Sequence, residues 1–206
     1  MAFAIPPLSL PAALTAAALA LSLSAAPALA GWSLDPARSH LAFVSIKSKD
    51  IGEVHSFNEM AGTIGDDGEV RVSLTLDSVE TLVPIRNERM RELLFQTTDY
   101  QNATLTAKVD PTLIAGMQPG DIAEITAEGI LSLHGEQQPM IVSMQAAKVA
   151  DGTVMVASTK PLIVDAAKFG LSDGVEKLRE IAGLASISNA VPVTFVMTFV
   201  EAPEAD

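Results

Sequence analysis

The sequence predicts an all-β fold with a minor α component, built as an antiparallel sandwich or barrel. The first observation is strict alternation: in Val70–Asp77 every even position is apolar and every odd one is polar. Successive side chains of a strand point to opposite faces, so this pattern is typical of a half-buried strand. The second observation is that turn signals recur at short spacing, and the third is that only two segments have a helical pattern.

Several further segments alternate in the same way or form β-branched, apolar runs, and each is expected to be a strand. In chain order the expected strands are 41–46, 70–77, 103–109, 125–133, 140–147, 154–162 and 191–200. Turns rich in Gly, Pro and Asp are expected at 65–68, 118–121, 134–135 and 151–152. Many strands joined by short turns favour an antiparallel sandwich or barrel.

Two segments are expected to be helical. Ile85–Phe95 follows Pro84, a residue suited to the first position of a helix. From about residue 174 to 182, apolar side chains recur at helical spacing. We expect Asp173 to cap this second helix and Gly183 to end it.

The strand faces expected to point inward carry several small residues. The small ones are Ala103, Ala107, Ala127 and Gly129, and they alternate with Leu105, Val109, Ile125, Leu131 and Leu133. The interior of a small barrel is either filled by side chains or holds one small ligand, and unfilled volume costs stability. The pattern leaves three readings open: the helix at 174–182 packs into the space, the twist of the sheet closes it, or a ligand occupies it.

Residues 1–30 have the pattern of a secretory signal peptide. They contain no charged side chain, and an apolar stretch at 14–23 is followed by a small-x-small site ending at Ala30. Prolines at positions 6, 7 and 11 argue against a membrane anchor, which needs about 20 good helix-forming apolar residues. We therefore expect cleavage near Ala30/Gly31, a single domain at 31–206, and export to a bacterial periplasm.

The net charge and the absence of cysteine exclude several classes of function for this domain. The formal net charge of −12 belongs entirely to residues after Ala30, so the domain is repelled by nucleic acid phosphates and by anionic lipid surfaces. No cysteine is present, which excludes disulfides and thiolate chemistry. No second apolar run is long enough for a membrane segment. The sequence leaves the oligomeric state open, a homodimer included.

Several motifs in the domain resemble those of the YceI family. They are Trp32-Ser33-Leu34-Asp35-Pro36, the stretch 57–64, the helix 84–95, Gly129–Gly135, and the run 169–195. The family consists of exported lipocalin-like barrels that bind polyisoprenoid lipids. The resemblance therefore implies an antiparallel, lipocalin-like eight-stranded β-barrel with one or two short helices, whose apolar interior holds a long isoprenoid chain.

If the chain binds such a lipid, apolar residues of the strands and helices are the candidates for contact with it. The candidates are Phe43, Leu74, Leu94, Leu105, Leu131, Phe169, Leu178, Ile181, Phe195 and Met197. Arg86, Arg89 and Arg91 are candidates for a pyrophosphate or carboxylate head group, because Arg makes forked contacts with anions. The alternative is a solvated helix face on which they pair with Glu88 and Glu92.

No catalytic or metal-binding residues are predicted. The histidines, His40, His55 and His134, lack the spacing of paired metal ligands, and no Gly-x-Ser-x-Gly motif is present. No cofactor is expected; an isoprenoid or a quinone would be a ligand. The leading hypothesis is a periplasmic carrier or store for such a lipid. One alternative is a protein-interaction module with a packed barrel, and another is a lipid-acting hydrolase or isomerase that uses His55 or His134.

Overall fold

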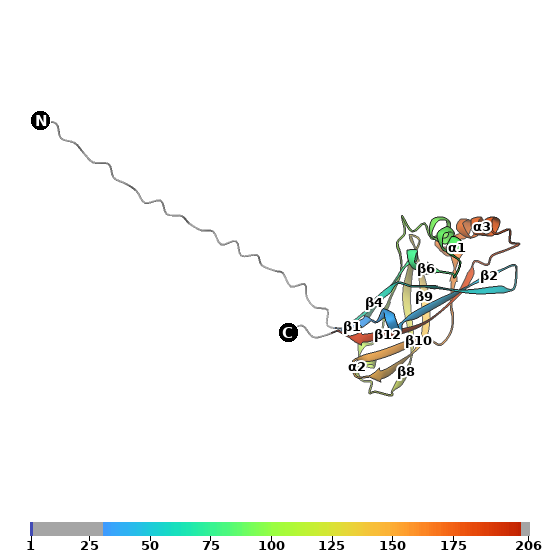
Figure 1. Cartoon of the computed structure of the whole chain (residues 1–206). Helices are drawn as coiled ribbons and strands as arrows, with labels where there is room; N and C mark the ends of the chain where they lie inside the picture. The colour runs from blue at the N-terminus through green and yellow to red at the C-terminus, as the bar shows by residue number, and fades with distance from the viewer. Residues whose placement is uncertain (2–30, 203–206) are drawn as a thin grey trace.

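A computed structural model of the chain describes residue 1 and residues 31–202 (Figure 1). The predicted signal peptide and its cleavage site thus lie almost wholly outside the described residues. The strands are β1 (Gly31–Leu34), β2 (His40–Lys47), β3 (Ile51–Phe57), β4 (Met60–Gly65), β5 (Glu69–Thr75), β6 (Val79–Glu80), β7 (Asn102–Lys108), β8 (Ile122–Leu133), β9 (Glu136–Ala150), β10 (Thr153–Ser158), β11 (Leu162–Asp165) and β12 (Ala190–Glu201). The helical segments are η1 (Pro36–Arg38), η2 (Leu76–Ser78), α1 (Pro84–Arg89), η3 (Met90–Phe95), α2 (Pro111–Ala115), η4 (Ala166–Phe169) and α3 (Ser172–Ile181).

The strands form one antiparallel sheet that closes on itself. The hydrogen-bonded order runs β1-β4-β5-β7-β8-β9-β10-β12, and β12 also pairs with β1. Four of the barrel strands are interrupted. β2 pairs with β12, as β1 does, and so continues β1. In the same way β3 continues β4, β6 continues β5 and β11 continues β10, so each pair acts as one barrel strand. The result is the predicted eight-stranded, lipocalin-like antiparallel barrel.

The predicted strands are present, and one of them is interrupted. The segment expected at 154–162 is divided into β10 and β11. The Ser158 hydroxyl accepts a hydrogen bond from the Phe195 amide (3.1 Å), so a side chain takes the place of a main-chain partner where β10 ends. The four predicted turns lie between strands or just before them, as expected.

The first predicted helix is found as α1 followed without a break by η3, a π-helix, and Pro84 is its first residue. The second begins two residues earlier than we predicted, because Gly170 (φ 66°) turns the chain from η4 directly into α3. The Val175 amide already bonds to the Leu171 carbonyl (3.0 Å), so Asp173 lies in the first turn and is not the cap. Gly183 follows the helix with φ 63°, as predicted.

The helices lie at opposite ends of the barrel. Figure 1 shows α1 and α3 over one end and α2 at the other, near the ends of β8 and β10. We call α1, η3 and α3 together the lid. α3 packs closely against η3 because residue 174 is glycine: a Cβ there would lie 2.6 Å from the Leu93 carbonyl oxygen. In the described part of the chain, no helix is long and apolar enough to cross a membrane.

Candidate functional site

The barrel encloses an apolar cavity of about 240 Å³. Every side chain that lines it is apolar, and the lining extends from the lid to α2 at the opposite end. Leu94, Leu171 and Val175 line it at the lid, and Ile114 of α2 lines it at the other end. The site therefore offers a long hydrocarbon chain a continuous apolar surface and no polar partner.

Strand alternation places the lining residues. On β5 the even positions face the cavity, and on β7 and β12 the odd positions do. The lining residues of these strands are Val70, Val72, Leu74, Ala103, Leu105, Ala107, Val191, Val193, Phe195, Met197 and Phe199. Period-two alternation is thus the signal by which further lining residues could have been found in the sequence.

The small inward residues leave the predicted space. Ala103, Ala107 and Ala127 line the cavity, as do all five of the larger residues predicted to alternate with them. Gly129 does not line it, because a Cβ there would lie 2.7 Å from the carbonyl oxygen of Thr106 and the β7 and β8 backbones are close at this point. α3 lies outside the barrel, so it does not fill the interior.

Most of the residues predicted to contact lipid line the cavity. Those that do are Phe43, Leu74, Leu94, Leu105, Leu131, Phe195 and Met197. Three others do not: Phe169 is fully buried in the core, Leu178 packs against the core, and Ile181 is 47% exposed. Only the Val175 side of α3 reaches the cavity, and the helix continues beyond it. The lipid contacts themselves stay a prediction.

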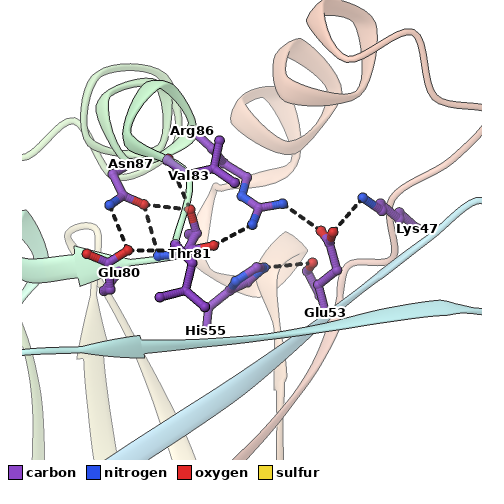
Figure 2. A network of polar contacts seen from close by, with 10 residues as sticks. Lys47, Glu53, His55, Glu80, Thr81, Val83, Arg86 and Asn87 are labelled. Atoms are coloured by element: carbon purple, nitrogen blue, oxygen red, sulfur yellow. Dashed lines mark hydrogen bonds and ion pairs between the residues drawn. The ribbon is translucent and has the colours of Figure 1, made fainter.

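A polar network joins the lid to the β2–β3 hairpin (Figure 2). Arg86 of α1 donates from Nη1 to Glu53 Oε2 (2.6 Å) and from Nη2 to the Thr81 carbonyl oxygen (2.6 Å). Lys47 Nζ lies 2.8 Å from the other Glu53 oxygen. The hydrogen bond from Lys47, together with the charge of Arg86, lowers the pKa of Glu53. One carboxylate thus joins two basic side chains from different elements.

Asn87 fixes the turn that leads into α1. Its side-chain oxygen accepts hydrogen bonds from the Thr81 amide (2.9 Å) and the Thr81 hydroxyl, and its Nδ2 donates to Glu80 Oε1 (3.1 Å). The hydrogen bond from Asn87 and one from the Leu82 amide lower the pKa of Glu80. The side chain of this buried asparagine thus makes three hydrogen bonds, two through its oxygen and one through its nitrogen.

His55 lies beneath this network and is only 4% exposed. Its Nε2 is 3.1 Å from the Ser45 hydroxyl, and its ring meets the ring of Phe43 edge-on at 5.3 Å between centroids. Burial lowers the pKa of His55, and the nearby positive charge of Arg86 lowers it further. The imidazole is therefore neutral near physiological pH, and its Nδ1 has no hydrogen-bond partner among the described residues.

The three predicted head-group arginines differ in their surroundings. Arg86 is held by Glu53, and Arg91 Nε lies 3.7 Å from Asp77 Oδ1. Neither pairs with Glu88 or Glu92, the partners of the alternative hypothesis. Within residues 31–202 Arg89 forms no ion pair. The sequence analysis missed the hairpin partners Lys47 and Glu53, which lie more than thirty residues from α1 and carry no motif.

The histidines do not form a common site. His134 lies against Tyr100 at the β8–β9 turn, with 4.2 Å between the ring centroids and 44° between the ring planes, and His40 is exposed on β2. Among the residues that the structure describes, no three His, Asp or Glu side chains lie close enough together to hold a metal ion.

Comparison with known proteins agrees with this architecture. The family model of the YceI-like domain matches residues 32–199. A polyisoprenoid-binding domain from Saccharophagus degradans, implicated in plant cell wall breakdown, is 35% identical, with a TM-score of 0.82 over 84% of this chain and 99% of that one. Burkholderia cenocepacia BcnA is 16% identical, with a TM-score of 0.63 over 80% and 98% of the two chains, and shares the fold. No curated protein matches. The chain belongs to the YceI-like domain family.

Proposed function

We propose that this chain is an exported, non-enzymatic protein that binds one long isoprenoid lipid, such as a quinone or a polyprenyl compound, and carries or stores it in the periplasm. The observation that carries the proposal is the cavity of about 240 Å³ with a wholly apolar lining. The similarity to a polyisoprenoid-binding domain supports the class of ligand. The signal-peptide pattern of residues 1–30 supports export.

Burial of hydrocarbon supplies the affinity. Each buried CH₂ contributes about 0.8 kcal/mol, and part of that gain offsets the loss of freedom on binding. An apolar cavity that stays empty also costs about 24 cal/mol per Å³, or about 6 kcal/mol for a cavity of about 240 Å³. A chain that fills the space removes this cost. A linear chain of methyl-branched isoprene units is wholly apolar, so it needs no polar anchor to be retained.

The lining also supports binding over catalysis. No nucleophile, acid or base is among the side chains that line the described cavity. His55 and His134, the residues of the enzymatic alternative, do not line it. A lipid held there meets only side chains that are chemically inert.

Native mass spectrometry of the product purified from the periplasm, followed by organic extraction, tests the proposal. The full chain is expressed with its own N-terminal residues. We expect a protein mass that corresponds to cleavage near Ala30 and an additional mass that extracts as an isoprenoid. A ligand-free mass that takes up neither quinones nor polyprenols would contradict the proposal and favour a protein-interaction module.

A matched pair of variants locates the ligand. Leu131 faces the cavity, while its neighbour Ile130 is 41% exposed on the outer face of β8. Leu131→Asp places a charge in an apolar cavity, where burial of an unpaired carboxylate costs several kcal/mol, so we expect loss of the extracted lipid. Ile130→Asp should retain it. Equal retention by both folded variants would show that the lipid is bound elsewhere.

A further inference from the structure

The inner face of the β2–β3 hairpin changes from apolar to polar toward the lid. On β2 the inward positions are Phe43 and then Ser45, and on β3 they are Phe57, His55 and Glu53, going outward from the barrel. Phe43 and Phe57 line the cavity. Across the hairpin, Phe43 pairs with His55 and Ser45 with Glu53. An amphiphile whose tail fills the barrel would therefore meet polar side chains next to this end of the cavity.

Two polar atoms in this region have no hydrogen-bond partner among the described residues. They are His55 Nδ1 and Arg86 Nε, and both are buried. Figure 2 shows the Arg86 guanidinium above the His55 ring, and the two side chains are close enough for the charge of Arg86 to lower the pKa of His55. Leaving a buried donor or acceptor without a partner is unfavourable, because the group has lost its hydrogen bonds to water. A further polar group bound in this network would offer both atoms a partner.

The charges of the network favour an uncharged group. Both terminal nitrogens of Arg86 and the ammonium of Lys47 are already occupied by Glu53 and the Thr81 carbonyl. A pyrophosphate would bring several negative charges next to the Glu53 carboxylate, and charges are costly to bury without free partners. A neutral oxygen needs less: the Arg86 Nε–H donates to it, and His55 Nδ1 accepts from a hydroxyl or, in the other tautomer, donates to a carbonyl.

We propose that His55 and Arg86 form the head-group subsite of the barrel and that it accepts an uncharged oxygen, the hydroxyl of a prenyl alcohol or the carbonyl of a quinone. The inference rests on the proposed function and narrows its ligand class. Of the three arginines of the lid helix, it assigns only Arg86 to the ligand. The tail lies in the cavity past Phe43 and Phe57, and the head lies between the hairpin and α1.

Competition between ligands with the same tail tests the subsite. The probes are geranylgeraniol, geranylgeranyl pyrophosphate and the matching hydrocarbon without a head group, offered in pairs at equal concentration to the delipidated protein. Native mass spectrometry gives the ratio of the two bound forms. We expect the alcohol to be preferred over the hydrocarbon by about five- to tenfold, the effect of one or two buried hydrogen bonds. The pyrophosphate should bind no more tightly than the alcohol.

The variants His55→Phe and His134→Phe are compared with the unaltered protein. Phenylalanine keeps a ring against Phe43, so His55→Phe should still take up the hydrocarbon but lose its preference for the alcohol. His134→Phe is the matched control, because His134 Nε2 is also buried without a partner among the described residues but lies against Tyr100, at the β8–β9 turn. It should keep the preference.

Several results would overturn the subsite. These are an alcohol preference that survives in His55→Phe, one that is lost in His134→Phe, or a pyrophosphate that binds more tightly than the alcohol. Uptake of the hydrocarbon in every variant, with no preference for any head group, would overturn the subsite and leave the proposed function intact. Failure of the unaltered protein to bind any of the three probes would overturn both.

Discussion

At the scale of single residues, His55 connects the barrel interior to the polar network. It is neutral because burial and the charge of Arg86 both oppose protonation. Its Nε2 forms a hydrogen bond with the Ser45 hydroxyl, while Nδ1 has no partner among the described residues. The residue can therefore bind a head group without adding charge to the interior, and protonation would destabilise the fold.

The pH dependence of stability follows from this pKa. The unfolded chain binds a proton at His55 near the ordinary pKa of 6.5, whereas the folded chain binds it only at lower pH. The unfolded state thus holds more protons in this interval, and the free energy of unfolding should fall as the pH decreases below about 6.5. Urea unfolding of the delipidated protein at a series of pH values between neutral and mildly acidic measures the slope.

A variant separates His55 from the other groups. His55→Phe should reduce the slope, because it removes the group whose pKa is lowered on folding. Glu53 has a lowered pKa too, so its contribution is lost at lower pH, below the ordinary value of 4.5. Equal slopes in the unaltered protein and in His55→Phe would show that His55 is not the group that titrates.

Individual lining residues were predictable where strand alternation applies. Leu105, Leu131 and Phe195 face the cavity because their neighbours in the sequence are on the outer face. Ile181 was predicted to contact lipid because it lies on the apolar side of its helix. That pattern does not show how far α3 extends beyond the barrel, and Ile181 is exposed. The contact between Arg86 and Glu53 was not predictable, since it depends on how the hairpin meets the lid.

At the scale of elements, the lid depends on a close approach of two helices. η3 is a π-helix, a rare form that is frequent at functional sites. It supplies Leu94 and Phe95 to the end of the cavity, and α3 packs against it at Gly174. The sequence predicted both helices but not this contact, because the role of Gly174 becomes visible only when the carbonyl of Leu93 is placed beside it.

Gly174→Ala should loosen the lid. Alanine is the better helix former by about 1 kcal/mol, so local propensity alone would stabilise α3. Its Cβ, however, would lie 2.6 Å from the Leu93 oxygen and 2.8 Å from Leu94 Cα, and backbone atoms cannot yield cheaply. We expect a loss of about 1–3 kcal/mol, faster amide exchange in η3 and α3, and faster release of bound lipid.

Gly52→Ala is the control for this change. A Cβ at residue 52 has Val44 Cγ1 as its nearest neighbour, at 3.5 Å, which is an ordinary contact. This variant should keep the lipid release rate of the unaltered protein. If Gly174→Ala released lipid at the same rate and were no less stable, the lid would not depend on the contact between α3 and η3.

At the scale of the whole molecule, closure of the barrel depends on pairing between the two ends of the described chain. β1 meets β12 in the register Trp32 with Glu201, and no local pattern could reveal this contact. Alternation alone left a sandwich and a barrel open, and the resemblance to a known family selected the barrel. When the barrel closes, small inward residues such as Ala103 and Ala127 leave a cavity between the strands. The volume of this cavity depends on all the strands together.

A cavity of this kind couples ligand binding to global stability. Natural domains are stable by only about 5–15 kcal/mol, so an empty apolar space that costs about 6 kcal/mol is a large fraction of that stability. A ligand present at about one hundred times its Kd stabilises the fold by about 2.7 kcal/mol. For a domain of this size, that corresponds to a rise in Tm of about 5–10 °C.

Differential scanning calorimetry before and after organic extraction of the lipid checks this coupling. Extraction should lower Tm, and addition of a long prenyl alcohol to the extracted protein should restore it, because the ligand binds only the folded barrel. A short alcohol of a single isoprene unit should restore little, since it buries few CH₂ groups. Leu131→Asp should show no response to either alcohol. An unchanged Tm in the extracted protein would mean that the barrel is equally stable when empty, and its small inward residues would then need an explanation other than a lipid.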